Sequence, residues 1–115
     1  MADSKKLAGL IGLAKRAGRA WGGLAATEAA VKRGEAYVLL MSSDAGASAA
    51  RTAAYWSDSN KIPLIQTDMS AVQLGGAIGR GNCAVVAVGE KNIATEIIRV
   101  HNAQYTNHNE DDGVR

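Results

Sequence analysis

Few residues in this chain are of the types that carry out covalent chemistry. The 115 residues include one cysteine and two histidines. Cys83 lies inside the apolar run 83–88, where a thiol is normally a small hydrophobic side chain rather than a nucleophile. His101 and His108 have no serine or carboxylate at a spacing typical of a catalytic pair. The sequence therefore predicts a protein that is not an enzyme, with no catalytic residue and no metal site.

A group of glycines could in principle wrap a phosphate: Gly75, Gly76, Gly79 and Gly81. Their spacing matches neither the nucleotide-binding loop GxxxxGK nor the dinucleotide fingerprint GxGxxG. They also lie between a predicted helix and the strand after it, whereas both fingerprints lead from a strand into a helix. We therefore expect no cofactor.

Charge is distributed unevenly, although the formal net charge is only +2. Residues 1–34 hold seven basic and two acidic residues, whereas residues 35–115 hold six basic and nine acidic residues. A basic surface built from the first third of the chain could attract phosphate. The same charges could instead form the ordinary solvated face of a helix, and charge alone favours this second interpretation.

The composition is that of one folded, soluble domain. Hydrophobic residues make up 47% of the chain and charged residues 21%, which excludes a wholly disordered protein. No apolar run approaches the roughly 18 residues that span a bilayer, so no membrane partner is expected. A single cysteine excludes an internal disulfide, and a reduced, cytoplasmic location follows.

Helices and short apolar strands are predicted to alternate along the chain. Helical spacing of apolar residues predicts helices over residues 4–17, 24–33, 47–57, 70–77 and 90–101, the fourth capped by Thr67 or Asp68. Continuous apolar runs predict strands over residues 37–41, 64–66 and 83–88, and a short extended piece precedes residue 24. This alternation predicts an α/β fold with helices on both faces of a small, mostly parallel sheet.

The last residues differ from the rest in composition. Residues 104–115 have no hydrophobic period and little to bury. We expect one domain over residues 1–103, followed by a disordered polar and acidic tail over residues 104–115.

Three collinear segments resemble a known family. They are GLAKRAGRAWGG (12–23), VKRGEAYVLLMSSDA (31–45) and LGGAIGRGNCAVVAV (74–88). Together they resemble the kink-turn RNA-binding ribosomal protein superfamily, and in particular its small, free-standing bacterial YlxQ-like members. The resemblance covers about residues 5–102. It implies a three-layer α-β-α sandwich with a small mixed, mostly parallel sheet and a structured, possibly ribosomal, RNA as partner.

The resemblance also implies where RNA would bind. The RNA-binding edge consists of the start of the second helix and the loop before the last strand. A helix that starts after Gly22 and Gly23 offers free backbone N–H groups to a phosphate. In the loop, Arg80 could pair with phosphate or stack on a base, and Asn82 could bond a base edge. The candidate RNA-binding residues are Arg19, Gly22, Gly23, Lys32, Arg33, Gly79, Arg80, Gly81 and Asn82.

The chain departs from the family's pattern at the second helix. Kink-turn binders typically show Gly-x-Asn-Glu-x-x-Lys there. Gly23 matches the glycine, but the other three positions are Ala25, Ala26 and Ala29. The sequence therefore predicts RNA binding with weakened kink-turn specificity. Trp21 could stack on a base if exposed, although a half-buried core position is the favoured interpretation.

A second hypothesis belongs to a different class of protein. The alanines at 25, 26, 29 and 30 could seat a partner helix or a second copy of the chain. The domain would then be a protein-interaction or dimerisation module that no longer binds RNA. A weaker third hypothesis is an accessory domain that presents RNA to a separate ribose methyltransferase. Ribosome association is possible under the first hypothesis, and a monomer is favoured.

Overall fold

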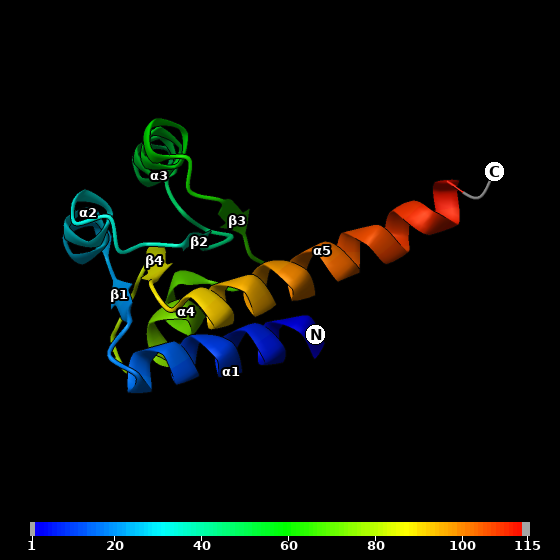
Figure 1. Ribbon diagram of the computed structural model, residues 1–115, viewed down its shortest axis with the longest axis horizontal. Coiled ribbons are helices and arrows are strands. Elements are labelled where there is room, and N and C mark those ends of the chain that lie inside the picture. The colour runs from blue at the N-terminus through cyan, green and yellow to red at the C-terminus, as the bar shows by residue number, and fades with distance from the viewer. Residues whose placement is uncertain (1, 114–115) are drawn as a thin grey trace.

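The computed structural model describes the backbone of residues 2–113 and the side chains of residues 4–103. Five helices surround a four-stranded sheet in this part of the chain (Figure 1). In chain order, the elements are α1 (Ala2–Arg16), β1 (Ala20–Gly22), α2 (Leu24–Lys32), β2 (Val38–Met41), α3 (Ala47–Asn60), β3 (Leu64–Gln66), α4 (Ala71–Ala77), β4 (Val85–Val88) and α5 (Lys91–Gly113). No helix within residues 2–113 is long and apolar enough to cross a membrane.

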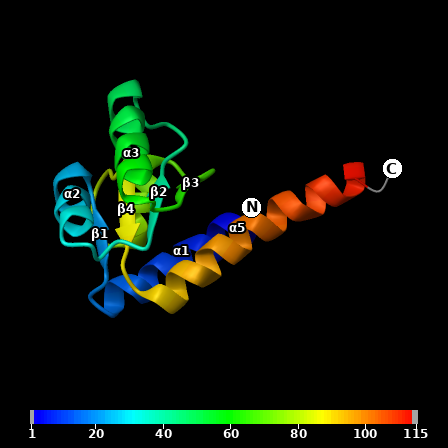
Figure 2. The ribbon, with the colours of Figure 1, turned by 45° about the horizontal axis from the view of Figure 1, so that its top comes forward.

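The elements form three layers. Helices α2 and α3 lie on one face of the sheet, and α1, α4 and α5 lie on the other (Figures 1 and 2). The α/β class and the α-β-α sandwich predicted from the sequence are therefore confirmed.

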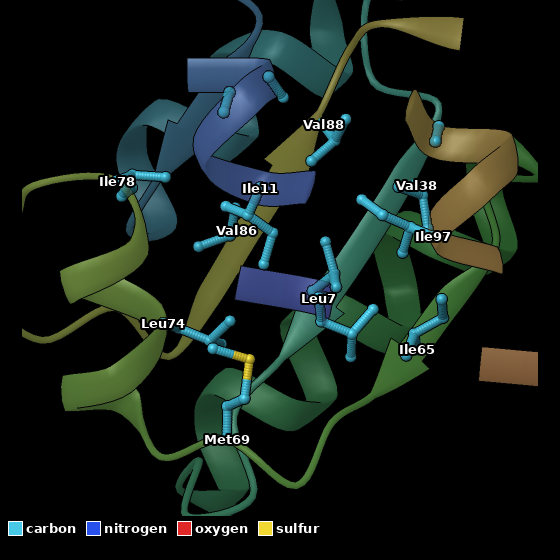
Figure 3. Close-up of a cluster of buried hydrophobic side chains, with 14 of the residues drawn as sticks. Leu7, Ile11, Val38, Ile65, Met69, Leu74, Ile78, Val86, Val88 and Ile97 are labelled. Carbon is cyan, nitrogen blue, oxygen red and sulfur yellow. The ribbon is translucent and has the colours of Figure 1, made fainter. Parts of the chain in front are cut away.

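The two central strands are buried on both faces. Val38 and Leu40 of β2 point into the larger core, which they share with Leu7 of α1 and Ile97 of α5 (Figure 3). Leu39, between them, points to the opposite face. There it packs with the following residues of α2, α3 and β4: Val31, Trp56 and Ala87. Strands covered on both faces need apolar residues at successive positions, which is why their sequences are continuous apolar runs.

The prediction that the sheet is mostly parallel is wrong. The strand order is β1-β4-β2-β3, and only β2 and β3 pair in parallel. Strand β4 runs antiparallel to both of its neighbours, with Trp21 opposite Ala87 and Leu39 also opposite Ala87. The sheet is mixed, as expected, but most of its pairings are antiparallel.

The length of α4 explains this difference. Helices α2 and α3 carry the chain back along the sheet, so β1, β2 and β3 all point the same way. Helix α4 has only seven residues, and it does not carry the chain back along the sheet. The N–H of Cys83 donates to the carbonyl oxygen of Ala71 (3.0 Å), so the chain re-enters the sheet at the end where it left. Strand β4 must then run in the opposite direction.

Two predictions about helix ends are also wrong. Helix α4 is capped by Ser70, whose hydroxyl accepts the N–H of Gln73 (3.1 Å), while Thr67 bonds elsewhere. The last helix was expected to end at His101, but α5 continues to Gly113. Most of the predicted tail 104–115 is therefore helical backbone, and residues 114–115 lie outside the described residues. No proline interrupts residues 91–113, so the loss of hydrophobic periodicity alone does not fix where this helix ends.

Thr27, on the inner side of α2, gives a testable contrast with Thr67. Both are buried, but the Thr27 hydroxyl has no hydrogen-bond partner among the described residues. The Thr67 hydroxyl donates to the carbonyl oxygen of Met41 (2.9 Å) and accepts the N–H of Met69 (3.1 Å). We expect Thr27→Val to leave the free energy of unfolding unchanged or to raise it by up to about 1 kcal/mol, and Thr67→Val to lower it by about 1–3 kcal/mol. Urea denaturation of the two variants checks this, and equal losses would contradict it.

Candidate nucleic-acid interface

The C-terminal end of β1 and the N-terminal end of β4 meet at one end of the sheet. Gly22 pairs with Val86, and the N–H of Gly23 donates to the carbonyl oxygen of Val85 (2.9 Å). Helix α2 begins at the next residue, so β4 fixes the position of its first turn. We call the start of α2 together with the loop 79–82 the α2 edge.

The first turn of α2 presents free backbone N–H groups. Gly23 is the N-cap residue, with φ of 90° and ψ of 161°, and it offers no side chain to cap the helix. The first turn contains no acidic residue, and both Leu24 and Ala25 are exposed. The partial positive charge of a helix N-terminus thus faces outward without a protein carboxylate in that turn to neutralise it.

The loop from Gly79 to Asn82 is exposed but anchored to α4. The N–H of Gly79 donates to the carbonyl oxygen of Gly76 (3.2 Å), and the N–H of Arg80 donates to that of Gly75 (2.7 Å). Gly79 has φ of 72°, a left-handed conformation that glycine adopts without strain. The loop therefore has a defined backbone while its side chains point to solvent.

Two close contacts through glycines bring the helix start and the loop together. A Cβ atom at Gly22 would lie 3.4 Å from Cδ of Arg80 and 2.8 Å from Sγ of Cys83, so the Arg80 side chain passes beside Gly22. A Cβ atom at Gly75 would lie 1.4 Å from the carbonyl oxygen of Gly81. Gly75 is thus a positioning residue that sequence reasoning missed, because its contact is formed by the fold.

The structure therefore gathers six of the nine candidate residues at the α2 edge: Gly22, Gly23, Gly79, Arg80, Gly81 and Asn82. Three cations predicted for the site lie elsewhere. Arg19 precedes β1, at the opposite end of that strand. Lys32 and Arg33 are at the far end of α2, where Lys32 pairs with Glu28 (3.5 Å).

The Arg33 side chain interacts with an aromatic ring and with a carboxylate close to it. Its guanidinium lies 5.7 Å from the ring centre of Trp21 and bonds Glu35 (3.1 Å). The Trp21 ring packs against the smaller core, and a Cβ atom at Gly89 would lie 2.6 Å from it. These contacts favour the half-buried core interpretation of Trp21 over a role in base stacking.

Asp44, in the loop after β2, lies at the same end of the sheet. Met41 at the end of β2 pairs with Val85. The Asp44 carboxylate accepts the N–H of Ala71 (2.9 Å), and the neighbouring Ser42 hydroxyl together with this hydrogen bond lowers the pKa of Asp44. The sequence signal for this charge is an acid three residues after the apolar run 38–41.

The geometry defines an α-β-α domain with an uncapped helix start and a basic, glycine-rich loop side by side at one end of a mixed sheet. The family model of the ribosomal protein L7Ae/L30e/S12e/Gadd45 family matches residues 5–98. The chain belongs to this family, whose members are mostly non-catalytic RNA-binding proteins.

Solved structures show the same fold. A protein of unknown function from Bacillus halodurans is 27% identical, with a TM-score of 0.77 over 84% of this chain and 97% of that chain. The 15.5kD RNA binding protein of Giardia lamblia is 19% identical, with a TM-score of 0.72 over 90% of each chain, and this likeness shows the fold alone. No curated protein matches the sequence.

Proposed function

We propose that this protein binds structured RNA, ribosomal or another non-coding RNA, through the α2 edge. The observation that carries the proposal is the meeting of the uncapped α2 start with Arg80 beside Gly22, in a chain of a family of RNA binders. A phosphate placed there would accept backbone N–H groups of α2 and pair with the Arg80 guanidinium. Arg19, Lys32 and Arg33 would contribute only a longer-range attractive field.

Weak kink-turn specificity is part of the proposal. Ala25 is exposed, and Ala26 and Ala29 are half-buried on the first two turns of α2. Methyl groups neither donate nor accept hydrogen bonds, so they do not read base edges. Contacts to phosphate and to the shape of the RNA would then supply most of the affinity. We further infer, from the resemblance of segments 12–23, 31–45 and 74–88, that the chain belongs to the bacterial YlxQ-like branch.

Titration against two RNAs tests the proposal. The first RNA contains a kink-turn, the second is an unkinked duplex of the same length, and both are measured at several salt concentrations. We expect binding to both with a small preference for the kink-turn, and a steep loss of affinity as salt rises. Absence of binding to either RNA at low salt would contradict phosphate-based recognition.

Arg80→Ala identifies the contact surface. We expect it to weaken binding to both RNAs by about 1–3 kcal/mol, because a charged contact to the RNA is lost. Lys91→Ala is the control, since it removes an exposed cation at the start of α5, after the opposite end of β4. Filter binding or fluorescence anisotropy measures both variants. Equal losses would show that binding depends only on net charge.

The alanines of α2 do not favour the interaction-module alternative. Ala30 is fully buried, Ala26 and Ala29 are half-buried, and only Ala25 of the four is exposed. They therefore do not form one continuous exposed face, and we propose no second function for α2.

A further inference from the structure

A groove lies between α1 and α5, which pack against each other. Figures 1 and 2 show these two helices side by side. The groove is shallow and open, with a volume of about 470 Å³, and none of its lining residues belongs to the α2 edge. The floor is apolar and consists of Gly9, Leu10 and Leu13 of α1 with Val100 of α5. Leu13 is 47% exposed, and nothing lies within 4 Å of a Cβ atom built at Gly9. A side chain from another molecule therefore has both room and apolar contact there.

The rim of this α1–α5 groove is basic. Lys5, Lys6 and Arg16 line it, and no ion pair involves them among the side chains of residues 4–103. The acid on the rim, Glu96, is already engaged, because it accepts Nε–H of Arg99 (3.0 Å). This hydrogen bond, together with the charges of Arg99 and Lys6, lowers the pKa of Glu96. The groove thus offers three cations on its α1 side beside an apolar floor, while α5 contributes Glu96 and Val100.

These properties distinguish an apolar ligand with an acidic flank from a bare phosphate chain. Phosphates would meet an exposed leucine, Leu13, on the floor and a carboxylate, Glu96, on the rim, and neither gives a favourable contact. Apolar side chains would instead cover Leu13, while carboxylates beside them reach the rim cations. From Lys5 to Arg16 the groove follows about three helical turns, or about 16 Å. A helix of similar length fits it in the helix-in-groove mode.

We propose that the α1–α5 groove binds an amphipathic helix of a partner protein, with leucine-like residues at i, i+3 or i+4, and i+7 and with acidic residues flanking this stripe on the α1 side. The apolar stripe lies on Leu10, Leu13 and Val100, and the acidic residues pair with Lys5, Lys6 and Arg16. This site is independent of the proposed RNA-binding function, because the two surfaces share no residue.

Two peptides and two charge-reversed variants test the proposal. The probe is a fluorescent, lactam-bridged peptide of about 14 residues, with leucines at the stated spacing and glutamates on the flank that faces α1. The control peptide carries lysines in place of the glutamates. We expect the wild-type protein to bind the glutamate peptide saturably and about tenfold more tightly than the lysine peptide. Lys5→Glu/Arg16→Glu should reverse this preference.

The matched control is Lys15→Glu/Lys91→Glu. It makes the same change in net charge at exposed cations on the same two helices that do not line the groove, so it should keep the wild-type preference. Leu13→Ser should weaken binding of both peptides, and circular dichroism confirms that each variant is folded. Equal effects of the two double variants, or no saturable peptide binding, would overturn the proposal. A larger loss of duplex RNA binding than of peptide binding in Lys5→Glu/Arg16→Glu would also overturn it, by making the groove a nucleic-acid surface.

Discussion

Gly75→Ala is expected to lower the free energy of unfolding by about 1–3 kcal/mol, whereas Gly76→Ala, one residue further along α4, is expected to raise it by about 0.5 kcal/mol. The new methyl group at 75 would overlap the Gly81 carbonyl group, which lies 1.4 Å from the Cβ position. Neither backbone can give way without breaking the bond from the Arg80 N–H to the Gly75 carbonyl oxygen (2.7 Å). At Gly76 nothing lies within 4 Å, and only the helix-forming advantage of alanine remains.

The Gly75→Ala and Gly76→Ala variants also distinguish an effect on stability from an effect on RNA affinity. If the loop positions Arg80, Gly75→Ala should lose about as much RNA affinity as Arg80→Ala, and Gly76→Ala should lose none. Urea denaturation gives the stability, and the duplex RNA titration gives the affinity. A Gly75→Ala protein that keeps wild-type affinity would show that RNA does not contact the loop in the conformation described above.

Restoring the family's pattern on α2 should have the second large effect. The triple variant Ala25→Asn/Ala26→Glu/Ala29→Lys is expected to raise affinity for a kink-turn over an unkinked duplex by about 1–3 kcal/mol. Ala25 is exposed and the other two are half-buried, so longer side chains can extend to solvent from these positions. They would supply the amide, carboxylate and ammonium groups that methyl groups lack.

The control for the triple variant introduces the same three residue types on α3 instead of α2. Asn, Glu and Lys placed at the uncharged, exposed positions Ser48, Ala54 and Ser59 of α3 add the same groups and the same net charge away from the α2 edge, and should not change the preference. Competition binding with the two RNAs measures the preference directly. If the triple variant gains nothing, the α2 edge differs from that of kink-turn binders in shape as well as in chemistry.

Much of the fold could be predicted because burial leaves a direct trace in the sequence. The runs at 38–41 and 85–88 are apolar at every position, since helices cover both faces of β2 and β4. The direction of β4 left no such trace, because it depends on where the chain re-enters the sheet after α4. The N-cap of α4 could have been predicted, since Ser70 and Gln73 have the spacing of a capping box. The prediction of Thr67 or Asp68 as the cap overlooks this spacing.

The candidate site was less predictable than the fold. The resemblance indicated the helix start and the loop, and the structure places these segments together. Charge counts suggested Arg19, Lys32 and Arg33, but a count does not say at which end of an element a cation lies. The contact between Gly75 and Gly81 could not be predicted from the sequence, because it depends on the path of the whole loop.

The position of β4 in the sheet has a consequence for synthesis of the protein. Strand β4 is the last strand in the sequence, yet it lies between β1 and β2 and is the only described strand that pairs with β1. Until residues 85–88 leave the ribosome, β1 has no partner and the sheet consists of the short β2–β3 pair, which is too small to be stable by itself. The chain therefore gains its fold late, nearly all at once, and a nascent chain that ends before β4 exposes its apolar strands to other molecules.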